Sequence, residues 1–322
     1  MIKYSLKRIL QLIPTIFIVV FIVFVLTRVI PGDPAAVMLG PQASVEAVQE
    51  LRDNLGLNDP IIEQFGRYLK DVAKGDLGNS YYYNQPVTKL INERFPNTLI
   101  LAILSIIIGL LIGIPVGVIS ATKQYSVFDY TSMILALIGI SVPIFWLAMM
   151  AVLLFSVNLG WLPSVGMGEG SIADIIQHLV LPSLCLATGP TAVFARFTRS
   201  SMLDITKQDY IKTARAKGLK EKLVIWKHAF KNALPPIITV AGMQFSQLLS
   251  GAVLTETVFS WPGIGKLIVD AIQNRDYTLV QGSVIYVAFI YVIINLIVDI
   301  CYALLNPKVK ASFEGNGEGG GK

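Results

Sequence analysis

The strongest constraint on this chain is a series of six apolar stretches, each long enough to cross a membrane as a helix. A hydrocarbon core about 30 Å thick requires roughly 20 mostly apolar residues per spanning helix. The stretches cover residues 9–30, 98–121, 131–157, 179–195, 233–259 and 280–305. Only 15% of the 322 residues are charged, whereas soluble domains carry about 25%. The sequence therefore predicts an all-α integral membrane protein with six transmembrane helices.

The distribution of positive charge predicts the orientation of these helices, because cationic loops mark the cytoplasmic side of a membrane. Residues 1–8 carry three Lys or Arg, and residues 196–231 carry ten. In contrast, residues 158–177 carry none and residues 260–279 carry two. We therefore expect both termini to be cytoplasmic.

The first 30 residues are predicted to be an N-terminal segment with a membrane helix that is retained. Basic residues precede the apolar stretch, as in a secretory signal peptide, but the stretch of about 22 residues exceeds the usual apolar region of 7 to 15. The following sequence, PGDPAAVMLG, has no clean cleavage site with small residues. We interpret this stretch as an anchor.

Three further regions follow along the chain. Residues 31–97 are predicted to be an extracytoplasmic loop with two short amphipathic helices that close near Gly56 and Gly75. Residues 98–310 form the predicted five-helix core. Residues 311–322 are rich in glycine, which predicts a flexible tail.

Prolines interrupt several of the predicted spans. A proline removes a backbone hydrogen bond, and membranes tolerate it where a neighbouring helix or a cavity satisfies the freed carbonyl. Bent helices around a pathway are one interpretation, and the general abundance of proline in membrane helices is the other. The prolines are Pro115, Pro143, Pro182, Pro190, Pro235 and Pro236. Separately, Gly109, Gly113 and Gly117 predict close packing of the second span against a neighbouring helix.

The residues that usually carry catalysis or bind metals are scarce. His178 and His228 are predicted to lie at opposite membrane faces, and Cys185 and Cys301 fall in separate spans, where packing is the better interpretation. The chain contains no HExxH, GxSxG or GxxxxGK[ST] motif. We expect a transport subunit that is not an enzyme, with no catalytic residue, no metal site and no bound cofactor.

Charged residues inside the spans are also few, although each costs about 2.5–3.5 kcal/mol at the bilayer centre. Arg28, Glu256 and Asp299 lie near span ends, where water or a partner is within reach. This pattern disfavours a secondary carrier or channel that works alone, because such a carrier often needs ionisable groups across the membrane. An intramembrane enzyme is a third class, but the sequence offers no nucleophile and base pair for it.

The most distinctive polar segment is residues 204–232, with eight Lys or Arg against three acids. Asp204 is expected to cap a short helix that ends before Gly218. The face with Ile211, Ala214 and Gly218, with Thr213 alongside, is small enough for another surface to approach closely. Positive-inside topology alone is the simplest alternative explanation of the charge.

Beyond Gly218, apolar residues recur at spacings typical of an amphipathic helix. They are Leu219, Leu223, Trp226 and Phe230, with lysines between them. Such a helix is expected to lie at the membrane surface, with Trp226 at the depth of the lipid headgroups.

The order of residues in this segment resembles the cytoplasmic EAA loop of ABC-importer permeases. YIKTARAKGL, residues 210–219, is followed by the basic amphipathic stretch and by NALPP, residues 232–236. Residues 212–214 stand at the EAA positions and Gly218 at the glycine of the motif. His228 and Lys231 replace an isoleucine and a proline of the general pattern, as is usual in the peptide-permease branch.

The resemblance extends over nearly the whole chain. The matching motifs are RVIPGDPA (28–35), GDLGNSY (75–81), PVTKLINERFPNTL (86–99), ETVFSWPGIGKL (256–267), NRDYTLVQG (274–282) and NLIVDICYALLNPKVK (295–310). Together they look like the B-type permease of dipeptide, oligopeptide and nickel importers.

This resemblance implies a type I ABC-importer permease fold in a bacterial or archaeal inner membrane. The implied partners are a second homologous permease, two ATPases that bind ATP and Mg, an extracytoplasmic substrate-binding protein and membrane lipid, with no nucleic acid. Peptides are the first expected substrate class, and nickel or a small solute such as glutathione is the alternative.

The resemblance also implies that the segment around residues 210–219 contacts an ATPase. The residues expected to couple to the ATPase are Tyr210, Thr213, Ala214, Arg215, Ala216, Gly218 and Leu219.

Overall fold

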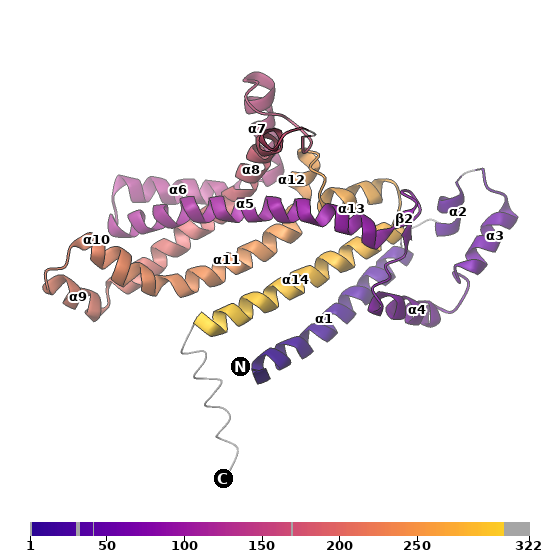
Figure 1. The fold of residues 1–322 in the computed structure, drawn as a ribbon, viewed down its shortest axis with the longest axis horizontal. Coiled ribbons are helices and arrows are strands. Elements are labelled where there is room, and N and C mark those ends of the chain that lie inside the picture. The colour runs from indigo at the N-terminus through magenta and orange to yellow at the C-terminus, as the bar shows by residue number, and fades with distance from the viewer. Residues whose placement is uncertain (1, 30–32, 41, 169, 306–322) are drawn as a thin grey trace, which may run out of the picture.

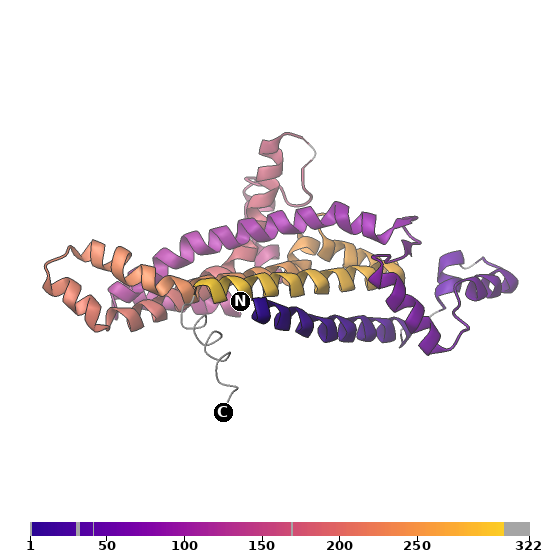
Figure 2. The same ribbon diagram turned by 60° about the horizontal axis from the view of Figure 1, so that its bottom comes forward.

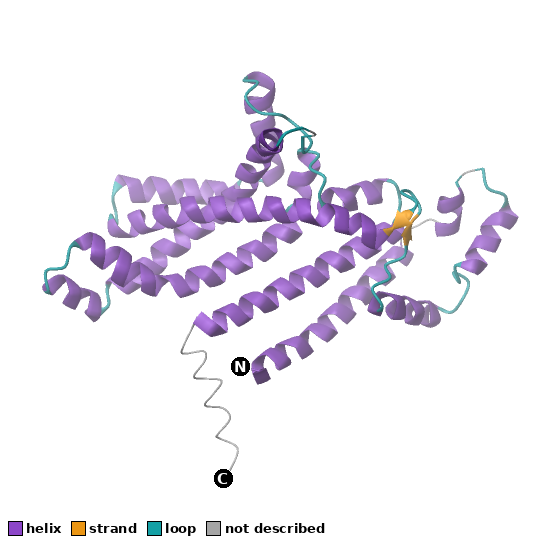
Figure 3. Cartoon of the chain, viewed as in Figure 1, coloured by secondary structure: helices purple, strands orange, loops and turns teal. Residues whose placement is uncertain are grey.

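The computed structural model describes residues 2–29, 33–40, 42–168 and 170–305. The predicted tail, residues 311–322, lies outside the described residues, as do the side chains of Asp299 and Cys301. Within these residues the chain is mostly helical and contains a small two-stranded hairpin (Figure 3).

The elements follow one another in this order. The first part contains α1 (Ile2–Val29), α2 (Pro34–Leu39), α3 (Val45–Asn54), α4 (Ile61–Ala73), β1 (Asn79–Ser80) and β2 (Gln85–Pro86). The middle contains α5 (Val87–Thr122), α6 (Val127–Ser141), α7 (Ile144–Ala151), the π-helix η1 (Val152–Asn158) and α8 (Ile172–Thr206). The last part contains α9 (Asp209–Ala216), α10 (Glu221–Leu223), the π-helix η2 (Val224–Phe230), α11 (Lys231–Gly251), α12 (Val253–Val258), α13 (Ile264–Gln273) and α14 (Tyr277–Leu305).

The long helices form an elongated body with a different small unit at each end. Helices α9 and α10 lie at one end of the long axis, and α2, α3 and α4 lie at the other (Figure 1). Helix α7 projects from the side of this body in both views (Figure 2). The two segments that the sequence places on opposite sides of the membrane are therefore far apart in the fold.

The structure confirms four of the six predicted spans by length and composition. These are Leu10–Val29 of α1, α5, α8 and Tyr277–Val298 of α14. The third predicted span is broken, because Val127–Ser141 and Ile144–Asn158 meet at an angle of 100°. The fifth predicted span is divided between α11 and α12, and neither helix qualifies as a span among the described residues.

Pro143 explains the break in the third span. Val142, the residue before it, has the extended conformation (φ −73°, ψ 127°), which a following proline favours because its ring crowds the helical conformation. Helix α7 then begins directly after Pro143. The other prolines named in the sequence lie inside continuous helices, so the helix is interrupted at Pro143 and not at the others.

Helices α5 and α8 pack closely through the glycines of α5, as the sequence predicts. A Cβ atom on Gly113 would lie 2.6 Å from the carbonyl oxygen of Thr191 and 2.7 Å from Cβ of Phe194. A Cβ atom on Gly117 would lie 2.5 Å from the carbonyl oxygen of Ala195. Any side chain at these positions would separate the two helices.

The two short helices predicted within residues 31–97 are present as α3 and α4. Gly56 (φ +61°) and Gly75 (φ +81°) follow their ends in the left-handed conformation, which confirms the predicted closures. Helix α4 packs through Phe65 and Tyr68 against a cluster that includes Val20 of α1 and Ile285 of α14. The loop is thereby attached to the helical body.

A buried carboxylate attaches the β1–β2 hairpin to the start of α14, beside a hydrogen bond from the Tyr81 hydroxyl to the Asn274 carbonyl (2.7 Å). Asp276 is 1% exposed. Its carboxylate accepts hydrogen bonds from the Ser80 hydroxyl (2.5 Å), the Tyr82 amide (3.3 Å) and the Leu279 amide (3.0 Å). Two motifs that are about 200 residues apart in the chain therefore meet at one side chain.

A second buried carboxylate, Glu256, supports the start of α13. It accepts hydrogen bonds from the Thr98 hydroxyl (2.6 Å) and the Lys266 amide (3.1 Å), and Thr98 Oγ1 in turn accepts from the Ile264 amide (2.9 Å). Because Gly263 at the N-cap has no side chain, Thr98 and Glu256 satisfy amides that would otherwise be free. Glu256 has the polar partners that a charge within an apolar stretch requires.

Candidate functional site

Helix α9 forms the centre of the candidate site, and its start differs from the prediction. Helix α8 continues through Asp204 to Thr206, so Asp204 does not cap the next helix. The chain breaks at Gln208, which is extended (ψ 147°), and α9 begins at Asp209. Buried Met202 holds this last part of α8 against the body of the protein, which keeps the chain helical past Asp204.

The end of α9 agrees with the prediction. Gly218 has φ +74°, a left-handed conformation that glycine adopts without steric penalty. The Gly218 amide donates to the Arg215 carbonyl (2.9 Å), and the Leu219 amide donates to the Ala214 carbonyl (3.4 Å). The space around Gly218 is open, since no atom lies within 4 Å of an added Cβ.

Thr213 and Gly218 of the predicted face are exposed, whereas Ile211 and Ala214 are turned inward against the protein's own helices. Both residues are buried. They belong to an apolar cluster with Met202 of α8 and with Val224 and Ala229 of η2. Burial of this apolar face removes it from water and attaches α9 to the helical body. Ala214 is consequently an internal packing residue.

The other six residues expected to couple to a partner lie on the outer surface. Tyr210 is 44% exposed and Leu219 is 37% exposed. The remaining exposed positions are Thr213, Arg215, Ala216 and Gly218. The structure therefore brings these six together on one accessible turn of chain, at the tip of the elongated body (Figure 1).

An ion pair links the end of α9 to the start of α10. The Arg215 guanidinium donates to both carboxylate oxygens of Glu221, at 2.7 Å from Nη2 to Oε1 and 3.1 Å from Nε to Oε2. The hydrogen bond from Arg215 lowers the pKa of the Glu221 carboxyl below its usual value, and the same bond raises the pKa of Arg215. The pair spans the turn at Gly218.

The predicted amphipathic stretch after Gly218 is present as α10 and η2. Leu223 and Trp226 are exposed on its outer side, and the Trp226 ring contacts Phe230 edge to face at 5.3 Å. Val224 and Ala229 face inward. The outer surface at the tip of the molecule is thus partly apolar.

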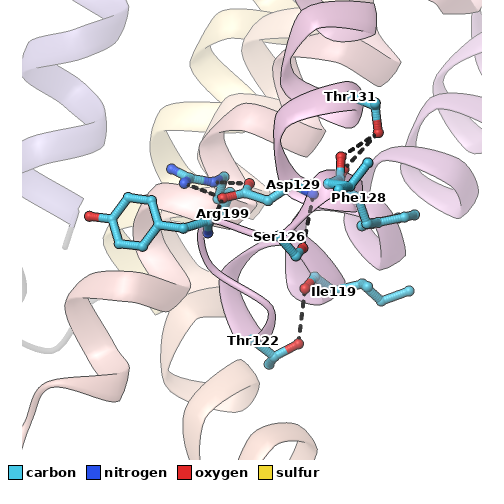
Figure 4. Close-up of polar contacts among 9 residues, drawn as sticks. Ile119, Thr122, Ser126, Phe128, Asp129, Thr131 and Arg199 are labelled. Atoms are coloured by element: carbon cyan, nitrogen blue, oxygen red, sulfur yellow. Dashed lines mark hydrogen bonds and ion pairs between the residues drawn. The ribbon is translucent and has the colours of Figure 1, made fainter.

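A buried ion pair beside this site was not predicted from the sequence. Arg199 of α8 donates from Nε to Asp129 Oδ1 (2.6 Å) and from Nη2 to Asp129 Oδ2 (2.7 Å), as Figure 4 shows. The Asp129 side chain is 2% exposed and the Arg199 side chain is 24% exposed. The parallel arrangement of the two bonds is the strong, bidentate form of this interaction.

The turn before α6 presents Asp129 to Arg199. Ser126 caps the helix by accepting a hydrogen bond from the Asp129 amide (3.2 Å), and the Tyr125 amide donates to Asp129 Oδ2 (3.0 Å). Ser126 and Asp129 have the spacing of a helix N-terminus, which is the one signal in the sequence. Nothing in that signal indicates Arg199, because the partner is 70 residues away.

Comparison with known proteins identifies the chain. The family described as "Binding-protein-dependent transport system inner membrane component" matches residues 113–311. The N-terminal family of the same transport-system membrane components matches residues 1–102. This chain belongs to that permease family.

Curated relatives cover the permease over nearly its full length. It is 44% identical to the dipeptide transport system permease protein DppB of Alkalihalophilus pseudofirmus, over 96% of this chain and 100% of the relative. It is 43% identical to the glutathione transport system permease protein GsiC of Escherichia coli K12, over 96% and 99%. Both relatives are named as permease proteins of transport systems.

A solved structure shares the fold of the permease. The inward-facing MetNI methionine ABC transporter has a TM-score of 0.57 at 20% identity, over 67% of this chain and 96% of that one. The protein is therefore a multi-pass membrane component with an ABC-transporter permease fold.

Within the residues that the structure describes, no group of three or more His, Cys, Asp or Glu side chains is placed to hold a metal ion. Cys185 is buried in an apolar cluster with Leu181 and Phe259, where it packs as a small apolar side chain.

Proposed function

We propose that this permease forms half of the membrane pathway of an ATP-driven importer of peptides. The full-length similarity to a dipeptide permease supports peptides as the substrate class. Similarity to a glutathione permease is nearly as high, and glutathione is itself a small peptide. Nickel is the more distant alternative.

The proposed assembly contains a second homologous permease, two ATPases that bind ATP and Mg, and an extracytoplasmic substrate-binding protein, in a bacterial or archaeal inner membrane. In this arrangement both termini and α9 are cytoplasmic. Six spans are reached if α6 with α7 and α11 with α12 each count as one, and the absence of Lys and Arg from residues 158–177 supports this orientation.

The way in which α9 is attached to the fold favours contact with an ATPase at this helix. Helix α9 is short, anchored through Ile211 and Ala214, and exposed on its other side with Tyr210 and Leu219. A rigid helix that is anchored in this way transmits a displacement by a closing ATPase to α8 and η2, because these are the elements against which it packs. Alternating access then becomes a movement of packed helices.

Substitution of Gly218 tests this proposal in the reconstituted complex. We expect Gly218→Trp to assemble normally but to hydrolyse ATP without uptake, because the indole occupies open surface where the ATPase docks. Gly218→Asn is the matched control, since asparagine tolerates positive φ better than most residues. Normal peptide uptake by Gly218→Trp, at equal amounts of complex, would refute the docking site.

The substrate is tested with the same complex and its binding protein. Labelled dipeptide, tripeptide, glutathione and nickel are offered separately, and ATP-dependent accumulation is measured. Accumulation of nickel alone would contradict the peptide assignment, and uptake without ATPases would indicate a secondary carrier.

A further inference from the structure

The Asp129–Arg199 pair is the charged contact that joins α6 to α8 near α9. The Asp129 carboxylate is almost fully buried and receives three hydrogen bonds, two from Arg199 and one from the Tyr125 amide. A buried carboxylate with this many donors stays in place, because leaving it unpaired costs several kcal/mol. The start of α6 is therefore fixed to one point on α8.

Apart from this pair, α6 packs along α8 through small side chains. Asp129 and Ala136 are the buried residues of this helix, and most of its large apolar side chains are exposed. Farther along, a Cβ atom on Gly139 would lie 3.8 Å from Cβ of Ala192, an ordinary van der Waals contact. Asp129 therefore adds to this packing a charged, directional contact at the start of α6.

Arg199 lies on the part of α8 that also contacts α5 and α9. The Arg199 amide nitrogen is 3.1 Å from the position of a Cβ on Gly117 of α5. One turn farther along, Met202 packs in the cluster that contains Ile211 of α9. A displacement of α9 thus reaches the segment of α8 that holds Arg199.

Beyond the break at Pro143, α7 replaces α6 as the helix that contacts α8. Ala148 of α7 is buried with Leu181 of α8 and with Phe259, which follows α12. Through α12, this cluster adjoins Glu256 and the start of α13.

We propose that Asp129 and Arg199 are a positioning pair that makes α6 move with α8 when α9 is displaced, so that the movement reaches α7 and α12. This role rests on the proposed ATP-driven import. The pair binds neither substrate nor nucleotide, and its effect is on the efficiency of coupling between ATP hydrolysis and transport.

A double-mutant cycle tests the pair in the full transporter complex. The variants are Asp129→Asn, Arg199→Gln and the double variant, and uptake and ATP hydrolysis are measured on equal amounts of assembled complex. We expect each single variant to lose uptake per ATP hydrolysed by about fivefold or more, at the low end of coupling between distant sites. The double variant should lose no more than the worse single variant, because the two residues act as one unit.

Two results would overturn the proposal. In the first, uptake and hydrolysis fall in the same proportion, which indicates a merely structural role. In the second, the losses of the single variants multiply in the double variant. If a single variant fails to assemble, the double variant is compared directly with the wild type, because it leaves no unpaired buried charge. The proposal then requires the double variant to lose uptake per ATP hydrolysed. Glu93→Gln, in an exposed 4.0 Å pair with Lys89, is the matched control and should behave as wild type.

A distance measurement separates this proposal from the substrate assignment. Spin labels are placed at exposed positions 135 in α6 and 204 in α8, in a background with Cys185→Ala and Cys301→Ala. In the wild-type complex the distance should be the same with and without ATP, and in Asp129→Asn it should change or broaden on ATP addition. A wild-type complex that takes up no peptide but keeps this distance would refute the import function alone. A distance between the two labels that changes on ATP addition in the wild type would refute the positioning role of the pair.

Discussion

At the scale of single residues, Arg215 and Glu221 hold together the two sides of the turn at Gly218. We expect Arg215→Gln to raise the pKa of Glu221 toward its usual value, because the hydrogen bond from Arg215 is the main cause of the lowered pKa. In the wild type, the pairing is complete above the usual pKa and is lost as the pH falls through the lowered one.

The pKa of Glu221 is measured by carboxyl NMR of the permease in nanodiscs. Since both side chains are substantially exposed, the effect on global stability should be small. Lys212→Gln is the control, because Lys212 pairs with Asp209 and not with Glu221. An unchanged pKa in Arg215→Gln would mean that the pair does not persist in solution.

At the scale of elements, the contact between α5 and α8 depends on the glycines of α5. We expect Gly113→Leu to lower stability by about 1–3 kcal/mol or to prevent folding, because the added atoms collide with the backbone at Thr191. The midpoint of thermal unfolding in detergent measures this. Gly189→Ala on α8 is the matched control, since nothing lies within 4 Å of the added Cβ. Equal midpoints for both variants would contradict the close packing.

The start of α13 depends on a hydroxyl from another helix. We expect Thr98→Val, which keeps the shape but loses the hydroxyl, to lower stability by about 1–3 kcal/mol, because Glu256 and the Ile264 amide each lose a partner. Thr98→Ser keeps the hydroxyl and should retain most of the stability. The same unfolding measurement compares them, and a Thr98→Val protein as stable as wild type would disprove this capping role.

The sequence predicts elements of this fold better than it predicts contacts between them. Apolar length identifies α1, α5, α8 and α14, and the glycine at position 218 identifies the end of α9, because both are local properties of the chain. Local pattern does not reveal which way the Ile211 face points, since small apolar residues suit a docking face and an inward face equally. Nor does it reveal the partner of Asp129, which depends on how α6 and α8 meet in space.

The prolines illustrate the same limit. Pro115 and Pro143 both lie in apolar stretches, yet only the second interrupts a helix. Whether the neighbouring residue becomes extended depends on the surrounding packing, which one sequence does not display.

At the scale of the whole molecule, Asp276 joins the β1–β2 hairpin to the last long helix. We expect Asp276→Ala to release residues 79–86 from the body, because the Ser80 hydroxyl and the Tyr82 amide lose their acceptor. Limited proteolysis should then cleave this hairpin faster than in the wild type. Asp270→Ala, which removes an ion pair with Lys266 and no hydrogen bond to the hairpin, should not accelerate cleavage. Equal cleavage of both variants would disprove the attachment.

The bend at Pro143 has a consequence for the life of the protein in the cell. Residues 144–158 carry no charged side chain, and Phe145, Trp146 and Met149 are exposed on a helix that projects from the body (Figure 1). A helix that is apolar all round needs apolar cover on every side. Lipid supplies that cover in a membrane, so we expect a chain that fails to insert to present this arm to water and to be removed by quality-control proteases.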